Sequence, residues 1–212
     1  MTILAGVISR HPSALISDSM CESFRNNLSR HPNDTPIEYR NDRVFFLKID
    51  IGAFGCAGHR TTPTHSFSML AGEPLLTCKG PVGPGRSAHL DFLQTEWEQE
   101  KFQSLRSASG TFCAVHYNPR SGKTHFMTDR LGLRPLFYSV LDDYIFFSSA
   151  LRVLEGMPEV PKIIDVQAVA EMTGFGYPLG NATPYQGIKT LLPCEVATHH
   201  QGELSLSKYF EL

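Results

Sequence analysis

The chain has 212 residues and a formal net charge of −2, from nineteen Lys and Arg against twenty-one Asp and Glu. Hydrophobic residues make up 42% of it and charged residues 19%, which excludes a disordered chain and leaves enough apolar side chains for a core. The near-neutral charge argues against a general nucleic-acid binder, and no apolar run approaches the ~20 residues that span a bilayer, so we expect neither nucleic acid nor membrane as a partner.

The first half of the chain predicts strands and helices separated by irregular loops. Apolar and β-branched runs favour strands at residues 2–9, 44–49 and 66–70. A helix is predicted near residues 21–28, and loops at 52–65 and 79–87. Ser87 is predicted to cap a second helix, whose apolar face holds Leu90, Leu93, Trp97, Phe102 and Leu105.

The second half predicts a series of hairpins. Strands are expected at residues 111–117, 123–129, 136–140 and 144–149, with turns between them. Asp165 is predicted to cap a helix that runs to about residue 172, and short strands follow residue 187. Sequential hairpins with few helices indicate an α+β fold, and the absence of a linker indicates a single domain.

The five cysteines, at positions 21, 56, 78, 113 and 194, have wide and irregular spacings and form no CxxC pair. This pattern predicts neither a disulfide framework nor a zinc site. The first residues carry no basic leader and no signal-peptide core, so we expect a cytoplasmic location.

Three groups of residues are candidates for chemistry on spacing alone. Residues 80–87 have the spacing of a phosphate-binding loop, but prolines remove backbone donors and Arg86 stands where Lys is needed. The close clusters of metal-ligand residue types are Cys56 with His59 and His199 with His200. Adjacent residues of a strand point to opposite faces, so His199 and His200 are poor co-ligands. We therefore predict no metal site. A Ser/His/Asp or Cys/His triad stays open, because its members can be distant in sequence.

Residues 129–138, DRLGLRPLFY, resemble the RDxxGxxPLYY signature of the asparagine synthetase family, within its N-terminal glutaminase domain, a class II glutamine amidotransferase. Other segments are similar to that family in the same order. The resemblance spans the whole chain, is strongest over residues 110–193 and weakest over 10–65. The further similar segments are 5–7, 110–115, 147–154, 165–169, 176–178, 183–188 and 191–193.

The resemblance implies a single glutamine amidotransferase type 2-like domain over residues 1–212. It implies an N-terminal-nucleophile hydrolase fold, a four-layer αββα sandwich with two mostly antiparallel sheets. In that family an N-terminal Cys attacks the glutamine amide and its own α-amine acts as the base. An Asn side chain and a backbone N–H stabilise the oxyanion, and an Asp and an Arg hold the two ends of the substrate.

This sequence departs from the family at three of those positions. Thr2 stands at the position of the nucleophilic Cys, Ala71 at that of the oxyanion Asn, and Ala88 at that of the substrate-binding Asp. Loss of one oxyanion donor costs on the order of 10²–10³ in rate, so with the Cys gone as well we expect background glutaminase activity.

Other parts of the family's substrate site are retained in the sequence. Gly72 and Glu73 keep the Gly-Glu of the family's Asn-Gly-Glu loop. Arg60 is the best candidate for the Arg that holds the substrate carboxylate, although its spacing to Gly72 is short. The resemblance therefore assigns substrate binding to Arg60, Gly72 and Glu73.

The leading hypothesis is a domain that has lost glutaminase activity and is the scaffold or regulatory half of an ATP-dependent amide-forming synthetase. Such synthetases include asparagine synthetases, β-lactam synthetases and lasso-peptide cyclases. The S-G-G-x-D-S loop of their ATP-pyrophosphatase domain does not occur in this chain. We therefore expect no cofactor here, ATP and Mg only in a partner synthetase domain, and that domain as partner in cis or in trans.

Three alternatives belong to other classes. An active amidohydrolase would use Thr2 as nucleophile after removal of Met1, because the mechanism needs a free α-amine. A nucleotide-binding module would use residues 80–87. An interaction or oligomerisation module, including a homodimer, would present an exposed apolar face near the C-terminus.

Overall fold

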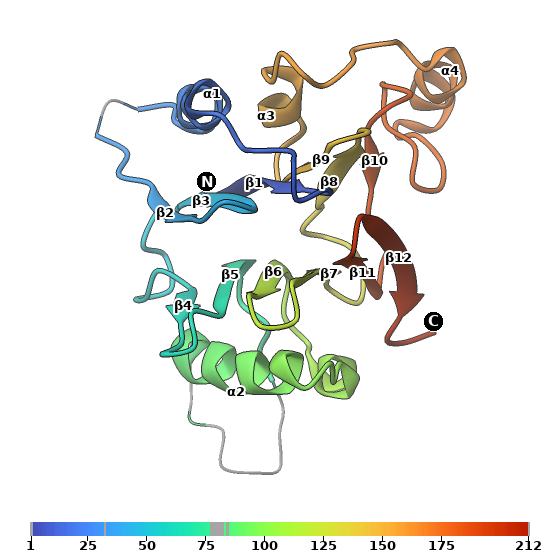
Figure 1. Cartoon of the computed structure of the whole chain (residues 1–212). Helices are drawn as coiled ribbons and strands as arrows, with labels where there is room; N and C mark the ends of the chain where they lie inside the picture. The colour runs from blue at the N-terminus through green and yellow to red at the C-terminus, as the bar shows by residue number, and fades with distance from the viewer. Residues whose placement is uncertain (1, 32, 77–82, 84, 212) are drawn as a thin grey trace. The chain divides into compact units, whose positions relative to one another are not determined.

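The computed structural model describes residues 2–31, 33–76, 83 and 85–211 (Figure 1). The chain divides into two compact units. The α2 unit contains the described residues of 1–2, 50–135 and 193–212, and the α1 unit contains residues 3–49 and 136–192. Each unit draws on segments that are distant in the sequence, and the predicted single domain over 1–212 stays a prediction.

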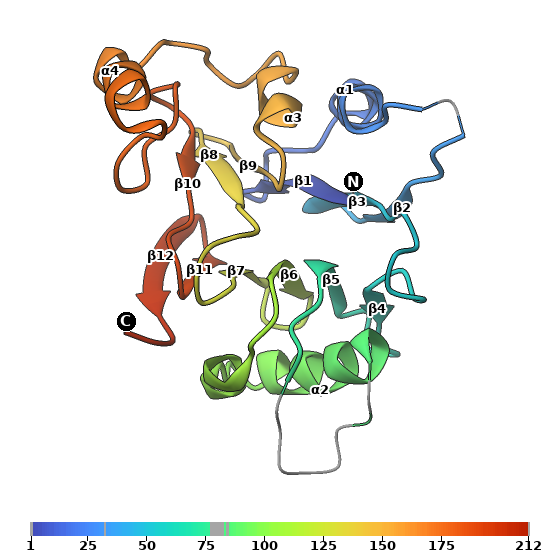
Figure 2. The same ribbon diagram turned by 180° about the vertical axis from the view of Figure 1, so that it is seen from behind.

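The α1 unit is built on a six-stranded antiparallel sheet with the order β10-β8-β9-β1-β3-β2. The helices α1 (Asp18–Leu28) and α3 (Leu151–Glu155) pack on its strands (Figure 2). In the core of this unit the Phe24 ring of α1 stacks on the Phe146 ring. The strands are β10 (Lys189–Thr190), β8 (Phe137–Val140), β9 (Tyr144–Ser148), β1 (Ile3–Ser9), β3 (Val44–Ile49) and β2 (Ile37–Arg40).

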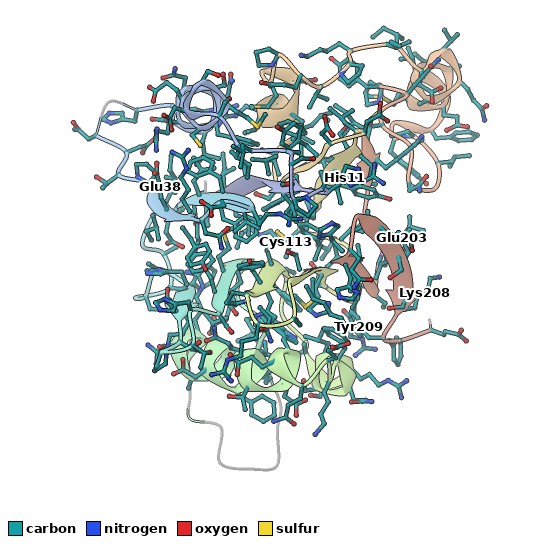
Figure 3. All side chains as sticks on the ribbon, in the orientation of Figure 1. His11, Glu38, Cys113, Glu203, Lys208 and Tyr209 are labelled. Carbon is teal, nitrogen blue, oxygen red and sulfur yellow. The ribbon has the colours of Figure 1, made fainter. Side chains whose placement is uncertain are left out.

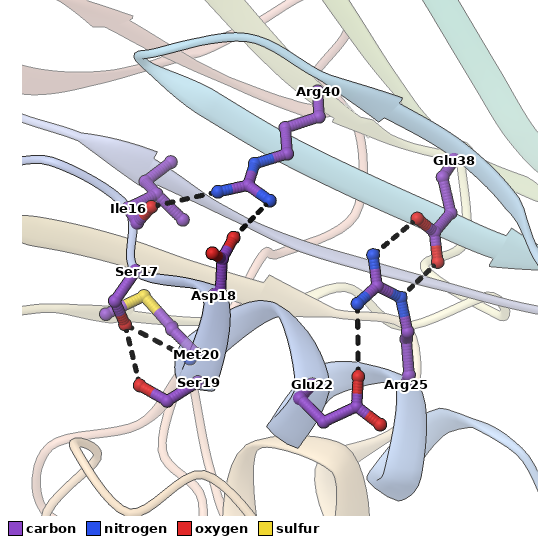
Figure 4. A network of polar contacts seen from close by, with 9 residues as sticks. All are labelled: Ile16, Ser17, Asp18, Ser19, Met20, Glu22, Arg25, Glu38 and Arg40. Carbon is purple, nitrogen blue, oxygen red and sulfur yellow. Dashed lines mark hydrogen bonds and ion pairs between the residues drawn. The ribbon is translucent and has the colours of Figure 1, made fainter.

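Polar contacts attach α1 to the edge strand β2 (Figure 4). Ser17 caps the helix by accepting a hydrogen bond from the backbone N–H of Met20 at 3.2 Å. The Arg25 guanidinium donates to both oxygens of Glu38 at 2.7 and 2.8 Å, and these bonds raise the pKa of Arg25. Because this pair is partly exposed, it orients the helix more than it stabilises the fold.

The α2 unit contains a second antiparallel sheet, with the order β12-β11-β7-β6-β5-β4. Helix α2 (Arg86–Glu98) packs on β4, β5 and β6 (Figure 1). Its Trp97 side chain is buried in the apolar core between the helix and the sheet. The strands are β12 (Glu203–Lys208), β11 (Glu195–His200), β7 (Lys123–Thr128), β6 (Phe112–Asn118), β5 (Phe67–Gly72) and β4 (His59–Thr61).

The turn between β7 and β8 is organised by Asp129, which is 1% exposed. One carboxylate oxygen accepts hydrogen bonds from the N–H groups of Leu131 and Leu133 at 2.9 and 3.1 Å. The other accepts from Phe112 and Arg134 at 3.1 and 3.0 Å. The Asp129 side chain thus closes the turn and ties it to β6, which is a structural role.

Two details of α2 differ from the sequence-based prediction. The predicted cap at Ser87 is wrong, because α2 begins at Arg86 and its N-cap is Gly85, whose φ of +93° favours glycine. The helix ends at Glu98, and Leu105 reaches the same core from a separate 3₁₀-helix, Gln103–Ser107. The predicted loop at 52–65 also contains β4.

The C-terminal segment returns to the core of the α2 unit after β12. Tyr209, which follows β12 in Figure 3, donates its hydroxyl hydrogen bond to the Thr128 carbonyl at 2.9 Å. Burial raises the pKa of this phenol. None of the helices in the described part of the chain is both long enough and apolar enough to cross a membrane.

Candidate functional site

Thr2, at the position of the family's nucleophile, lies directly before β1 and is 4% exposed. Its Oγ1 accepts a hydrogen bond from the backbone N–H of Ile51 at 3.5 Å. The hydroxyl is therefore placed beside the segment that follows β3, where Asp50 precedes Ile51.

Asp50, next to Ile51 in the chain, forms a buried ion pair with Arg86. The Arg86 guanidinium donates from one nitrogen to an Asp50 carboxylate oxygen at 3.0 Å. The Arg86 side chain is 0% exposed and that of Asp50 is 5% exposed. A fully buried guanidinium requires a charge partner and acceptors for its N–H groups, and Asp50 supplies the charge.

Backbone and aromatic groups complete the surroundings of the Arg86 guanidinium. It donates to the carbonyls of Cys56 and Leu70, both at 2.8 Å, and lies over the Phe54 ring at 5.0 Å from the centroid. Gly58 has a φ of +57°, and a Cβ at that position would overlap the guanidinium. We call Asp50, Phe54, Cys56, Leu70 and Arg86 the Arg86 network.

The retained Gly-Glu pair forms a backbone joint at the end of β5. Gly72 has a φ of +89°, and a side chain there would overlap the Thr111 carbonyl oxygen. The Glu73 N–H donates to that same carbonyl at 3.1 Å. Ala71, fully buried on β5, directly follows Leu70 of the Arg86 network. The close approach of the Thr111 carbonyl therefore explains the glycine at position 72, and the backbone of Glu73 has a structural role in the same contact.

The remaining predicted positions lie on or beside α2. Ala88 is two residues after Arg86 on the helix. Arg60 of β4 donates to Asp91 of α2 at 2.6 Å, with half of its side chain exposed. Arg60 also lines a cavity of about 430 Å³ together with Cys56, Gly58 and Ser87. Thr2 contacts Ile51, next to Asp50, and Ala71 and Ala88 follow Leu70 and Arg86 by one and two residues in the chain, whereas Arg60 lines the neighbouring cavity.

Sequence reasoning missed Asp50 as part of this site and treated Arg86 only as a defective phosphate-loop residue. The available signals were an Asp directly after a buried strand and an Arg at the start of a helix, and neither is specific. Of residues 80–87, positions 80–82 and 84 lie outside the described residues. Arg86 itself is committed to Asp50 and two carbonyls, so it does not present its charge to a phosphate.

Among the described residues, a Ser–His pair lies close together and is relevant to the open triad alternative. Ser68 Oγ and His116 Nδ1 are 2.9 Å apart, and both residues are 0% exposed. Burial lowers the pKa of His116 to about 3, with a further contribution from His125. A pair without access to solvent, whose imidazole is a weak base, serves the packing of the sheet rather than catalysis.

Metal binding has no support among the described side chains, where no group of three or more His, Cys, Asp and Glu could hold a metal ion. The histidines at 199 and 200 pair with Leu204 and Glu203 across β11 and β12 as strand residues.

Comparison with solved structures places the fold. The chain is similar to the glutamine phosphoribosylpyrophosphate amidotransferase from B. subtilis complexed with ADP and GMP, with a TM-score of 0.62 and 9% identity over 98% of this chain and 49% of that one. It is also similar to a structure described as the allosteric regulatory enzyme of purine biosynthesis, with a TM-score of 0.52 and 12% identity over 98% of this chain and 43% of that one. These likenesses confirm the predicted α+β class and N-terminal-nucleophile hydrolase fold.

Residues 92–210, more than half of the chain, match the glutamine amidotransferase domain family, and the chain belongs to that family. It is 23% identical over 121 residues to a glutamine-hydrolysing asparagine synthetase, number 3, of Bacillus subtilis strain 168. The aligned part is 55% of this chain and 19% of the synthetase, so the chain spans about a fifth of that relative's length. The family match begins after Ala88, so Thr2, Ala71 and the Arg86 network lie outside it.

Proposed function

We propose that this glutamine amidotransferase domain does not hydrolyse glutamine and is the scaffold or regulatory half of an ATP-dependent amide-forming synthetase. The observation that supports it best is the buried pair of Arg86 and Asp50 beside Thr2. The synthetase is of the asparagine synthetase, β-lactam synthetase or lasso-peptide cyclase type.

The pair removes the electrostatic basis for holding a free amino acid. Glutamine carries an ammonium and a carboxylate, and a binding site needs an unpaired anion and cation to receive them. Here the Asp50 carboxylate and the Arg86 guanidinium neutralise each other, and the other guanidinium contacts are backbone carbonyls. Breaking a buried pair leaves an uncompensated charge, at a cost of about 3–5 kcal/mol.

The chemical step also lacks a side-chain oxyanion donor, and its hydroxyl nucleophile depends on a free α-amine. A Thr hydroxyl needs a base to take its proton, and in this fold class the base is the α-amine of the nucleophile itself. Ala71 offers only a methyl group where an oxyanion donor is needed. The missing donor alone lowers the rate by about 10²–10³.

The first test is an assay for ammonia and glutamate release from glutamine, with the B. subtilis synthetase as positive control. We expect the wild-type chain and the Thr2→Ala variant to give the same background rate. Turnover that Thr2→Ala abolishes would refute the proposal and support the Thr2 amidohydrolase. Intact-mass measurement of the same sample shows whether Thr2 carries a free amine.

The second test addresses the partner. We expect an S-G-G-x-D-S motif either further along the same reading frame or in a neighbouring gene. The two polypeptides, or the two halves of one, are then expressed together and apart, and ATP-dependent pyrophosphate release is measured. Equal activity of the synthetase half with and without this domain would count against a supporting role.

A further inference from the structure

A small polar cavity of about 190 Å³ lies in the α2 unit, where the segment that follows α2 meets the end of β12. Its volume is below the ~300–1,000 Å³ of pockets that take drug-sized ligands, so it has room only for a small molecule or an ion. Two segments that are distant in the chain form its walls. The lining residues that matter here are Glu100, Gln103, Arg106, Lys208 and Tyr209.

The Arg106 guanidinium is oriented at this cavity by a contact of its own. Arg106 lies on the 3₁₀-helix Gln103–Ser107, and its Nε donates to the Tyr209 carbonyl at 2.7 Å. Tyr209 is anchored in turn, because its hydroxyl donates to the Thr128 carbonyl. Within the described part of the chain, the two terminal nitrogens of Arg106 have no acceptor. A guanidinium that is oriented through Nε and keeps its terminal N–H groups open is suited to bidentate contact with an oxyanion.

Lys208 adds a second positive charge to the same cavity. It is the last residue of β12 and directly precedes Tyr209, and Figure 3 labels both residues where β12 ends. The ion pairs between described residues include neither Lys208 nor Arg106. Two cations therefore line one small cavity, and no described carboxylate pairs with either of them.

Glu100, the acidic residue of the lining, is bound to a different cation. Both of its carboxylate oxygens accept from the Lys123 ammonium, at 2.6 and 2.8 Å, and this contact lowers the pKa of Glu100. The backbone of Glu100 has a φ of +57°, in the region that favours glycine, so a glutamate is held there at a conformational cost. Its carboxylate neutralises Lys123 and leaves the charges of Arg106 and Lys208 to a ligand from solution.

We propose that this cavity binds a small oxyanion of the phosphate class, with Arg106 as the bidentate donor and Lys208 as the second cation. Two unpaired positive charges favour a dianion, and the Gln103 side-chain amide supplies a neutral donor beside them. The proposal is independent of whether the domain hydrolyses glutamine. A free phosphate ion and a small phosphate ester present the same group, so the experiment separates these two sources.

The test is calorimetric titration of the full chain with sodium phosphate at about pH 8, where a phosphate group is a dianion, and at low ionic strength. We expect a one-to-one complex with a Kd of about 1 mM or lower. Arg106→Lys keeps the charge but loses the planar fork, and we expect it to raise the Kd at least about tenfold. Lys208→Gln removes the second cation, and we expect it to raise the Kd at least about threefold. Far-UV circular dichroism confirms that each variant is folded.

The matched control is Arg120→Lys, because Arg120 is exposed in the turn between β6 and β7 and does not line the cavity. We expect this variant to bind phosphate as the wild type does. A wild-type chain that binds no phosphate at about ten times the expected Kd overturns the proposal. A Kd that neither Arg106→Lys nor Lys208→Gln changes overturns it as well, since the ion is then bound elsewhere.

Methyl phosphate, titrated in the same way, distinguishes the two sources of the ligand. A Kd at least about threefold below that of inorganic phosphate supports a site for phosphate esters, and an equal or higher Kd supports a site for the free ion. Sodium chloride at the same ionic strength is the blank. If chloride displaces phosphate at equal concentrations, the site has no preference for a dianion and the proposal is wrong.

Discussion

The Arg86 guanidinium is a fully buried positive charge, and the Asp50 carboxylate is its charge partner. The rest of its surroundings are neutral: two carbonyls, the Phe54 ring and the bare Cα of Gly58. Arg60, on β4, also pairs with an aspartate, Asp91, but both side chains of this pair are exposed to solvent. The two Arg–Asp pairs of one unit thus provide a comparison between a buried and an exposed ion pair.

We expect Asp50→Asn to lower the free energy of unfolding by about 3–5 kcal/mol, because it leaves the Arg86 charge buried and uncompensated. The matched control, Asp91→Asn, breaks the exposed pair with Arg60 and is expected to change it by no more than about 1 kcal/mol. Urea unfolding at pH 7 measures both. Equal effects of the two substitutions would show that Arg86 reaches water.

At the residue scale, the sequence predicts which family residues are absent better than it predicts which new contacts take their place. A resemblance reveals that Thr2, Ala71 and Ala88 depart from a known pattern, since each is a substitution at a defined position. It does not reveal that Arg86 and Asp50 pair, because that contact joins positions 36 apart across a loop and depends on the space left by Gly58.

Among the elements, the sheet of the α2 unit contains a row of four polar side chains, of which those of Ser68, His116 and His125 are buried. Ser68, His116, His125 and Thr198 occupy directly paired positions on β5, β6, β7 and β11. The two imidazole rings stack with centroids 6.0 Å apart, and His125 Nδ1 contacts Thr198 Oγ1 at 3.0 Å. Burial lowers the pKa of His116 to about 3 and that of His125 to about 4.

These shifts predict a fold that weakens in acid. Both histidines stay neutral in the folded state, whereas in the unfolded chain their side chains bind protons below the ordinary histidine pKa of about 6.5. Stability is therefore full above pH 6.5 and falls as the pH drops towards 4 and 3. At pH 5 the two sites together cost about 4 kcal/mol. Urea unfolding between pH 7.5 and 4.5 gives this slope.

His125→Gln is expected to remove about half of the slope between pH 6.5 and 4.5, whatever its effect on stability at pH 7.5. His11→Gln, at an exposed histidine, is the matched control substitution. A slope that His125→Gln does not alter would mean that other groups govern the acid response.

Element positions follow well from local patterns in this chain. The hairpin strands of the second half and the Asp165 cap of helix α4 (Val166–Phe175) agree with prediction, because alternation, turn residues and capping are all local signals. The start of α2 does not agree, because Gly85 and Ser87 are both acceptable caps and the backbone conformation at Gly85 decides between them. The exposure of α4 is not predictable from its sequence, since an apolar helix is ordinarily read as buried.

The Asp129 turn has a consequence for how such chains are recognised. Its carboxylate accepts hydrogen bonds from four backbone N–H groups, so its loss would open the turn that follows β7 and detach that turn from β6, whether or not the protein is an enzyme. The family match spans this turn and none of the positions discussed as catalytic. Family membership inferred from that segment therefore indicates the fold and gives no information about catalysis. Genome surveys that infer ammonia-producing capacity from that segment alone do not read position 2, which is Thr in this chain.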